Sequence, residues 1–141
     1  GAGMTLGAEL ILNKDKALLH AHSDMHLKGG NVINQGEILS QGLLSTSLSD
    51  SFQNEGFVFS QQGMNFQFDE GFYNVTPKSL YGKKVAHVLS YGDITFENRK
   101  GTRSQWVENV SGKIETVSPL EVLGATPKTS DISYPKCLSP P

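Results

Sequence analysis

Residues 34–53 read NQGEILSQGLLSTSLSDSFQ, and residues 54–73 read NEGFVFSQQGMNFQFDEGFY. The two segments align without a gap, with identities at Asn34/Asn54, Gly36/Gly56, Ser40/Ser60, Gln41/Gln61 and Phe52/Phe72. A repeat of about 20 residues is in the range of solenoid proteins, in which each repeat buries its apolar face against the next one. The repeat therefore predicts an elongated stack, which favours a mechanical or adhesive function over catalysis.

Each repeat divides into three short strand-like runs, which end with Phe52 in the first repeat and Phe72 in the second. Three strands per turn predict an all-β fold, a right-handed parallel β-helix with coils of about 20 residues stacked about 4.8 Å apart. A β-sandwich is the alternative, because short alternating strands with Gly-rich turns also fit that fold. The expected core positions are Ile38, Leu44, Leu48, Phe52, Val58, Met64, Phe66, Phe68 and Phe72.

One turn of the repeat carries Asn34, Asn54 and Asn74. Asn tolerates the left-handed backbone conformation, and its amide can bond to the Asn one coil away. Gly36 and Gly56 are expected to supply a positive φ beside it. The sequence therefore predicts a structural ladder of side-chain amides at this turn.

The chain of 141 residues has the length of one domain. Residues 1–4 read as a cloning scar before an excised piece of a larger protein, so a missing export signal is uninformative. Residues 5–124 are expected to form a β-solenoid fragment with irregular insertions near 74–92 and 98–105. Residues 125–141 are rich in proline and are expected to form a flexible tail.

Composition excludes several classes of partner. The formal net charge is -2 and charged residues make up 18% of the chain, which argues against binding to nucleic acid. No run of about 18 apolar residues is present, so no membrane span is expected. Cys137 is the single cysteine, which rules out a disulfide within the chain.

Two further pieces of sequence carry a resemblance. The pattern Asn-x-Gly-x-(Ile/Val)-x-Ser occurs at 34–40 and 54–60, and residues 93–98 (DITFEN) precede residues 109–116 (NVSGKIET). Together they resemble the filamentous-haemagglutinin repeats of bacterial two-partner-secretion exoproteins, and the second piece is similar to the contact-dependent growth-inhibition branch. The resemblance covers about residues 5–117.

This resemblance implies a long β-helical filament with no catalytic activity of its own. Such a filament is exported through an outer-membrane secretion pore, displayed on the surface of a Gram-negative cell and used in adhesion or toxin delivery. It also implies segments that bind a receptor or glycan on a target cell.

The stretch HAHSDMH, residues 20–26, is the best candidate for a metal site. If it were one straight strand, His20, His22, Asp24 and His26 would share a face, and imidazole and carboxylate are zinc ligands. The alternative is a solvated face, because four such neighbours span roughly 20 Å, too far to surround one ion. The expectation is therefore no metal, with these three histidines as weak candidates.

Catalytic and cofactor motifs are not recognised in the sequence. Gly29-Gly30-Asn31 lacks the Lys and Ser/Thr of a phosphate loop, and no Gly-x-Ser-x-Gly elbow occurs. A carbohydrate-active β-helix enzyme would need carboxylates on the outside of consecutive coils, and the two aligned repeats show no acidic row. The sequence therefore predicts no enzyme and no cofactor.

Partner contact is predicted at two places. If Val58 points inward, Phe57 and Phe59 point outward beside Leu39 and form an apolar stripe, unless residues 76–84 fold over them. Two basic clusters in the irregular segments could meet anionic glycans, or could simply be solvated loops. Their residues are Lys78, Lys83, Lys84, Arg99, Lys100 and Arg103.

Overall fold

The computed structural model describes residues 3–98, 106–117, 120–123 and 126–128, and within them the chain is all-β with parallel sheets. The strands are β1 Met4–Asn13, β2 Leu18–Ala21, β3 Met25–Asn34, β4 Glu37–Ser40, β5 Leu43–Leu48, β6 Ser51–Asn54, β7 Phe57–Ser60, β8 Gly63–Phe68, β9 Gly71–Val75, β10 His87–Ser90, β11 Ile94–Asn98, β12 Trp106–Val110, β13 Lys113–Thr116, β14 Leu120–Leu123 and β15 Thr126–Lys128. One 3-10 turn, η1 Lys78–Leu80, lies between β9 and β10. No helix in the described part of the chain is long and apolar enough to span a bilayer.

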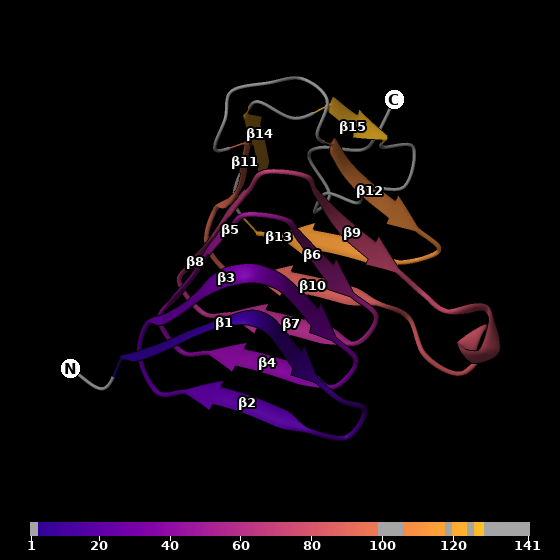
Figure 1. Ribbon diagram of the computed structural model, residues 1–141. Helices are drawn as coiled ribbons and strands as arrows, with labels where there is room; N and C mark the ends of the chain where they lie inside the picture. Colours follow the sequence, from indigo (N-terminus) through magenta and orange to yellow (C-terminus); the bar gives the residue numbers. More distant parts are fainter. Residues whose placement is uncertain (1–2, 99–105, 118–119, 124–125, 129–141) are drawn as a thin grey trace.

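The strands belong to two sheets through which the chain passes repeatedly (Figure 1). One sheet has the order β13-β10-β7-β4-β2, and the other runs β14-β11-β8-β5-β3-β6-β9-β12-β15, with β1 also paired to β3. From β4 the chain enters β5 and β6 of the second sheet and returns to the first at β7. The described strand pairs are all parallel, whereas a β-sandwich of the usual kind is built from antiparallel sheets.

The register between strands follows the sequence repeat. Ile38 pairs with Val58, Leu48 with Phe68, and Phe52 with Phe72, so residues 20 positions apart are neighbours on adjacent strands. This confirms the predicted vertical alignment of the two repeats. Parallel strands bring like residues together at one height, and the apolar pairs of the repeat therefore form continuous rows.

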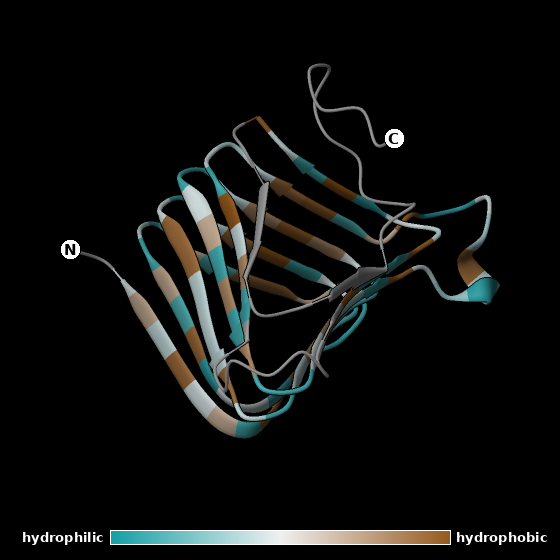
Figure 2. Ribbon diagram, turned by 90° about the horizontal axis from the view of Figure 1, so that it is seen from above, coloured by the Kyte–Doolittle hydropathy of each residue, from teal (hydrophilic) through white to brown (hydrophobic). Residues whose placement is uncertain are grey.

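The core lies between the two sheets, and all nine predicted core positions are buried. Figure 2 shows apolar and polar residues alternating along the strands, as expected where one face is buried. Four phenylalanines pack at its centre: the rings of Phe66 and Phe72 lie 4.5 Å apart, and those of Phe66 and Phe96 lie 5.4 Å apart and stacked. The fourth, Phe52, stacks on Phe72 at 5.2 Å.

The expected amide ladder is present and is longer than the sequence repeat. Asn34 Nδ2 donates to Asn54 Oδ1 at 2.9 Å, and Asn54 Nδ2 donates to Asn74 Oδ1 at 2.8 Å. The ladder continues to Asn13 at one end, at 2.9 Å, and to Asn109 at the other, at 2.7 Å. Sequence analysis missed these two because their offsets, 21 and 35 residues, differ from the repeat of 20.

The expected role of the two repeat glycines was wrong. Neither Gly36 nor Gly56 has a positive φ, and the ladder asparagines are not left-handed either. Instead, both glycines lie where one turn of backbone rests on the next: a Cβ on Gly36 would stand 2.3 Å from Ala17 O, and one on Gly56 would stand 2.2 Å from Gly36 O. Glycine is therefore required at these two positions because the backbone of the neighbouring winding leaves no room for a Cβ atom. A special backbone conformation is not the reason.

The interruption expected near 74–92 is narrower in the structure. Asn74 belongs to β9, and β10 pairs with β7 in the same register as β4, so the chain leaves the regular pattern at residues 76–86. Thr76 closes the base of this excursion, because its Oγ1 donates to Ser111 O at 2.6 Å and accepts from Ala86 N at 2.8 Å. Figures 1 and 2 show its η1 turn projecting sideways from the stack. Most of the second predicted insertion, residues 99–105, lies outside the described residues.

Candidate functional site

The outer faces of the two sheets differ in chemistry. On the β13-β10-β7-β4-β2 sheet, Leu39, Phe59 and Leu89 form one outward row, and Tyr91 next to it is 49% exposed. The corresponding outward rows of β5 and β8 carry Ser45/Asn65 and Ser47/Gln67. This row ends in His20 and Glu115, and the outward row beside it includes Glu37, His87 and Lys113. The sheet therefore carries an apolar stripe in the middle of its outer face, here called the apolar face, whereas the outward rows of β5 and β8 are polar.

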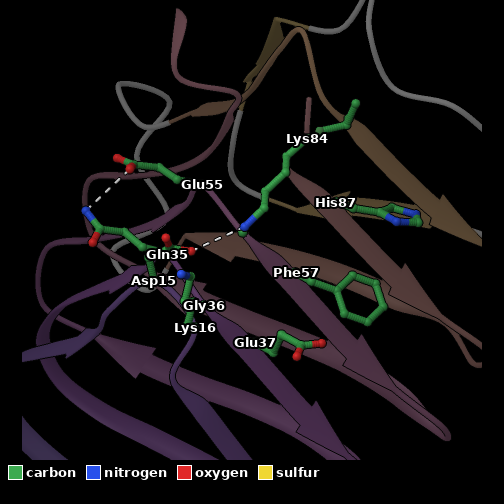
Figure 3. A pocket seen from close by; sticks show the side chains of 11 residues that line it. Asp15, Lys16, Gln35, Gly36, Glu37, Glu55, Phe57, Lys84 and His87 are labelled. Carbon is green, nitrogen blue, oxygen red and sulfur yellow. Dashed lines mark hydrogen bonds and ion pairs between the residues drawn. The ribbon is translucent and has the colours of Figure 1, made fainter. Parts of the chain in front are cut away.

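An open groove of about 560 Å³ lies at the edge of the apolar face, where the chain turns from the Asn ladder into β4 and β7. Figure 3 shows it from close by. Its lining residues come from three successive windings and from the end of the excursion: Asp15, Lys16, Gln35, Gly36, Glu37, Glu55, Gly56, Phe57, Lys84, Val85 and His87. Its volume lies within the usual range of ligand pockets.

Charged groups of both signs line the groove, and several already have partners. Lys84 Nζ lies 3.3 Å from Asp15 Oδ1, in a pair whose side chains are 59% and 60% exposed. Such exposed pairs contribute at most about 1 kcal/mol, so this one is readily opened. Glu55 accepts hydrogen bonds from Gln35, at 3.5 Å, and from Gln53. Three acidic and two basic side chains give the lining a formal charge of -1 with His87 neutral.

Phe57 is half-buried and connects the groove to the apolar face. It pairs in register with Glu37 on one side and His87 on the other, and its ring lies 5.3 Å from the His87 ring. His87 Nε2 is itself buried; it makes no hydrogen bond but lies 3.0 Å from Glu115 Oε1, the distance of an ion pair. One part of the Phe57 ring therefore faces the groove, and the other part packs against neighbouring side chains such as His87.

Phe59 is also half-buried, and its cover comes from its own sheet. Its ring lies 5.3 Å from Tyr91 in an edge-to-face contact and 6.3 Å from Phe57. Of the predicted cover, residues 76–84, Lys84 reaches the groove beside Phe57, whereas the η1 turn projects away from the stack (Figure 1).

We expect Phe59→Ser to lower the free energy of unfolding by about 1–2 kcal/mol, because a half-buried ring leaves only part of a cavity. Urea denaturation followed by circular dichroism measures the effect, with Phe66→Ala as the reference for a buried ring, for which about 3–5 kcal/mol is expected. An equal loss for the two variants would contradict the assignment of Phe59 to the surface.

The histidine candidates do not share one strand face. β2 ends at Ala21 and β3 begins at Met25, so His20 and His26 lie on strands of different sheets. The rings of His20 and His22 lie 4.6 Å apart, whereas His26 Nδ1 lies 2.7 Å from Ser45 Oγ. In the described residues no three His, Cys, Asp or Glu side chains come together as metal ligands. Sequence analysis missed the bend at residues 22–23.

The basic residues named in the sequence separate as well. Lys84 pairs with Asp15 in the groove, and Lys83 and Lys78 lie exposed on the excursion. Arg99, Lys100 and Arg103 lie outside the described residues. The other groove residues were not predicted as a site. Gln35 and Glu55 occupy equivalent places of the repeat, which marks them as neighbours but not as part of a groove, and no motif marks Lys16.

The pKa of one tyrosine outside the groove, Tyr73 on β9, differs from its usual value. Burial raises the pKa of Tyr73 above its usual range, and the carboxylates of Glu108, Glu70 and Asp50 raise it further. The phenol of Tyr73 therefore stays protonated to a higher pH than an ordinary tyrosine.

Comparisons with protein-family models, with curated proteins and with solved structures found no match to this chain.

Proposed function

We propose that the chain is a non-catalytic shaft or recognition segment of a large exported surface filament, used in adhesion or in contact-dependent growth inhibition. The observation that carries the proposal is the repeated winding itself. Strands 20 residues apart lie in parallel register, and the side-chain amides of Asn34, Asn54 and Asn74 are hydrogen-bonded in one row. Each winding contacts its neighbours, which lets such a fold extend to any length.

The proposal includes the finer description of the fold as a right-handed parallel β-helix. Connections between parallel strands of one sheet are right-handed in about 98% of cases. The path from β4 through β5 and β6 to β7 is a connection of this kind, since β4 and β7 pair in parallel. A β-helix of this hand also fits the resemblance to filamentous-haemagglutinin repeats.

The parent protein would then pass through an outer-membrane secretion pore and stand on the surface of a Gram-negative cell. In the growth-inhibition branch it would carry a toxin beyond this segment. The neutral, solvated exterior of β5 and β8 suits a shaft that must stay soluble. The repeat supports the proposal both through the stacked windings it produces and through the resemblance that it carries in part.

Surface display tests this proposal. Antibodies raised against residues 1–128 are expected to label intact cells of the source bacterium, and brief protease treatment of intact cells is expected to remove the signal. Deleting the gene of the partner pore should abolish the labelling. Retention of the protein in the cytosol of untreated cells, protected from the protease, would overturn the assignment to a surface filament.

A receptor- or glycan-binding module is the second candidate, and the groove favours it over plain shaft. Binding residues are usually carried on irregular segments held by a rigid scaffold, and the groove lies where the excursion meets the regular windings. Here Lys84 and Val85 come from the excursion, whereas Phe57 and Glu37 come from the windings.

A carbohydrate-active enzyme is the least favoured reading. Glycoside hydrolysis ordinarily uses two free carboxyl groups on either side of the scissile bond. Of the three acids in the groove, Asp15 pairs with Lys84 and Glu55 accepts hydrogen bonds from Gln35 and Gln53. This leaves Glu37, and a single carboxylate supports binding better than hydrolysis.

A further inference from the structure

We propose that the groove beside β4 and β7 binds a neutral saccharide, with one sugar ring stacked on Phe57 and its hydroxyl groups bonded to the polar side chains around it. This inference rests on the second candidate function, recognition of a glycan. The sequence-based expectation placed partner contact on Phe57, Phe59 and the basic clusters, and named anionic glycans as one possible ligand of those clusters; the groove points to a neutral one.

The charges of the groove select against an anionic ligand. A sulfated or phosphorylated sugar would meet three carboxylates, those of Asp15, Glu37 and Glu55, against the two ammonium groups of Lys16 and Lys84. A cationic ligand would meet the ammonium groups of Lys16 and Lys84, and the side chain of Lys84 reaches across the groove between the Gln35–Glu55 pair and the Phe57 ring (Figure 3). Mixed donors and acceptors without a strong net charge suit a neutral polyhydroxyl compound.

The exposed part of the Phe57 ring supplies a flat seat for a sugar ring. Gly36 and Gly56 also line the groove, but their absent Cβ atoms would face the backbone of the neighbouring winding. Phe57 stands beside Gly56 with part of its ring exposed. The face of an aromatic ring carries negative charge density, and the axial C–H bonds of a pyranose are weakly positive, so the two surfaces stack.

Hydrogen-bonding groups surround this seat from separate windings. Glu37 is exposed and pairs in register with Phe57, which places its carboxylate next to the ring. Gln35 and Lys16 also line the groove from neighbouring turns. A carboxylate accepts from two adjacent hydroxyls, whereas an ammonium and an amide donate to ring and hydroxyl oxygens. These groups together match the alternating donors and acceptors around a hexose.

Binding to a printed glycan array, followed by saturation-transfer NMR with the neutral sugars that bind, tests the proposal on the whole chain. We expect neutral oligosaccharides to bind and heparin-derived tetrasaccharide to bind at least tenfold more weakly. Phe57→Ala and Glu37→Gln should each weaken binding of the neutral sugar by about tenfold. Glu37 is exposed, so its substitution tests the site without threatening the fold.

Tyr91→Ala is the matched control, because Tyr91 is an exposed aromatic on the same sheet but outside the groove. It should leave the affinity unchanged. The saccharide site would be overturned if no neutral glycan bound to the unmodified chain more strongly than to the Phe57→Ala variant. It would also be overturned if the heparin fragment bound more tightly than every neutral sugar. Such a result leaves the surface-display test unaffected, so failure of the saccharide site and failure of the filament proposal are distinguishable.

Discussion

Replacing Gly56 by alanine is expected to remove a large part of the stability of this protein. The added Cβ would stand 2.2 Å from Gly36 O and 2.8 Å from the carbonyl carbon and oxygen of Gln35. These are backbone atoms of the preceding winding, so no side chain can move aside, and the two windings must separate. We expect a loss of at least about 3 kcal/mol in the free energy of unfolding, measured by urea denaturation, out of a total that is typically about 5–15 kcal/mol.

Gly7→Ala is the control for this substitution. Gly7 lies in β1, where the nearest atom to an added Cβ is Lys28 O at 3.7 Å, an ordinary contact. We expect its effect to stay within about 0.5 kcal/mol, as for other substitutions at exposed positions. If the two alanine variants unfolded at the same urea concentration, the close stacking of windings at Gly56 would be disproved.

Replacing Asn54 by alanine is expected to lower the free energy of unfolding by about 3–5 kcal/mol. Asn54 is fully buried at the centre of the ladder and donates to Asn74 Oδ1, to Gly56 O at 3.1 Å and to His87 O at 3.2 Å. It also accepts from Asn34 Nδ2. Truncation leaves several buried polar groups without this partner, each at a cost of about 1–3 kcal/mol. Thermal and urea denaturation measure the loss.

Asn65→Ala provides the comparison, because Asn65 is an exposed asparagine on the outer face of β8. Its removal should change the stability by less than about 0.5 kcal/mol. Hydrogen exchange adds a local readout: in the Asn54→Ala variant the amides of β6, β7 and β9 should exchange faster than those of β1. Equal stability of the two asparagine variants would show that the ladder contributes nothing to the fold.

The repeat in residues 34–73 was enough to predict the strands, the register and the core. Apolar residues at equivalent places, such as Ile38 and Val58, can share one buried row only if successive windings lie on top of each other. The same logic placed Asn34 above Asn54. Local sequence decides these features because they depend on a period that the chain itself repeats.

The prediction failed where the reason for a residue lies in a neighbouring winding. Gly36 and Gly56 were assigned to positive φ, but they are needed because carbonyl oxygens of the preceding turn come too close for a Cβ. The three histidines were placed on one straight strand, but the chain bends between β2 and β3. The residues next to Gly36, Gly56 and the three histidines in the sequence do not indicate the close backbone contact or the bend.

The amino-acid order by itself therefore determined the repeating strands, their parallel alignment and the amide ladder, since a fixed period translates directly into contacts between equivalent side chains. Only the tertiary structure decided where the groove lies. The groove brings together Asp15, Glu37, Phe57 and Lys84. The two residues of its ion pair, Asp15 and Lys84, are 69 positions apart in the sequence. The repeat already places Glu37 beside Phe57. No period of the sequence relates Asp15 to Lys84, and only the excursion brings Lys84 back to the groove.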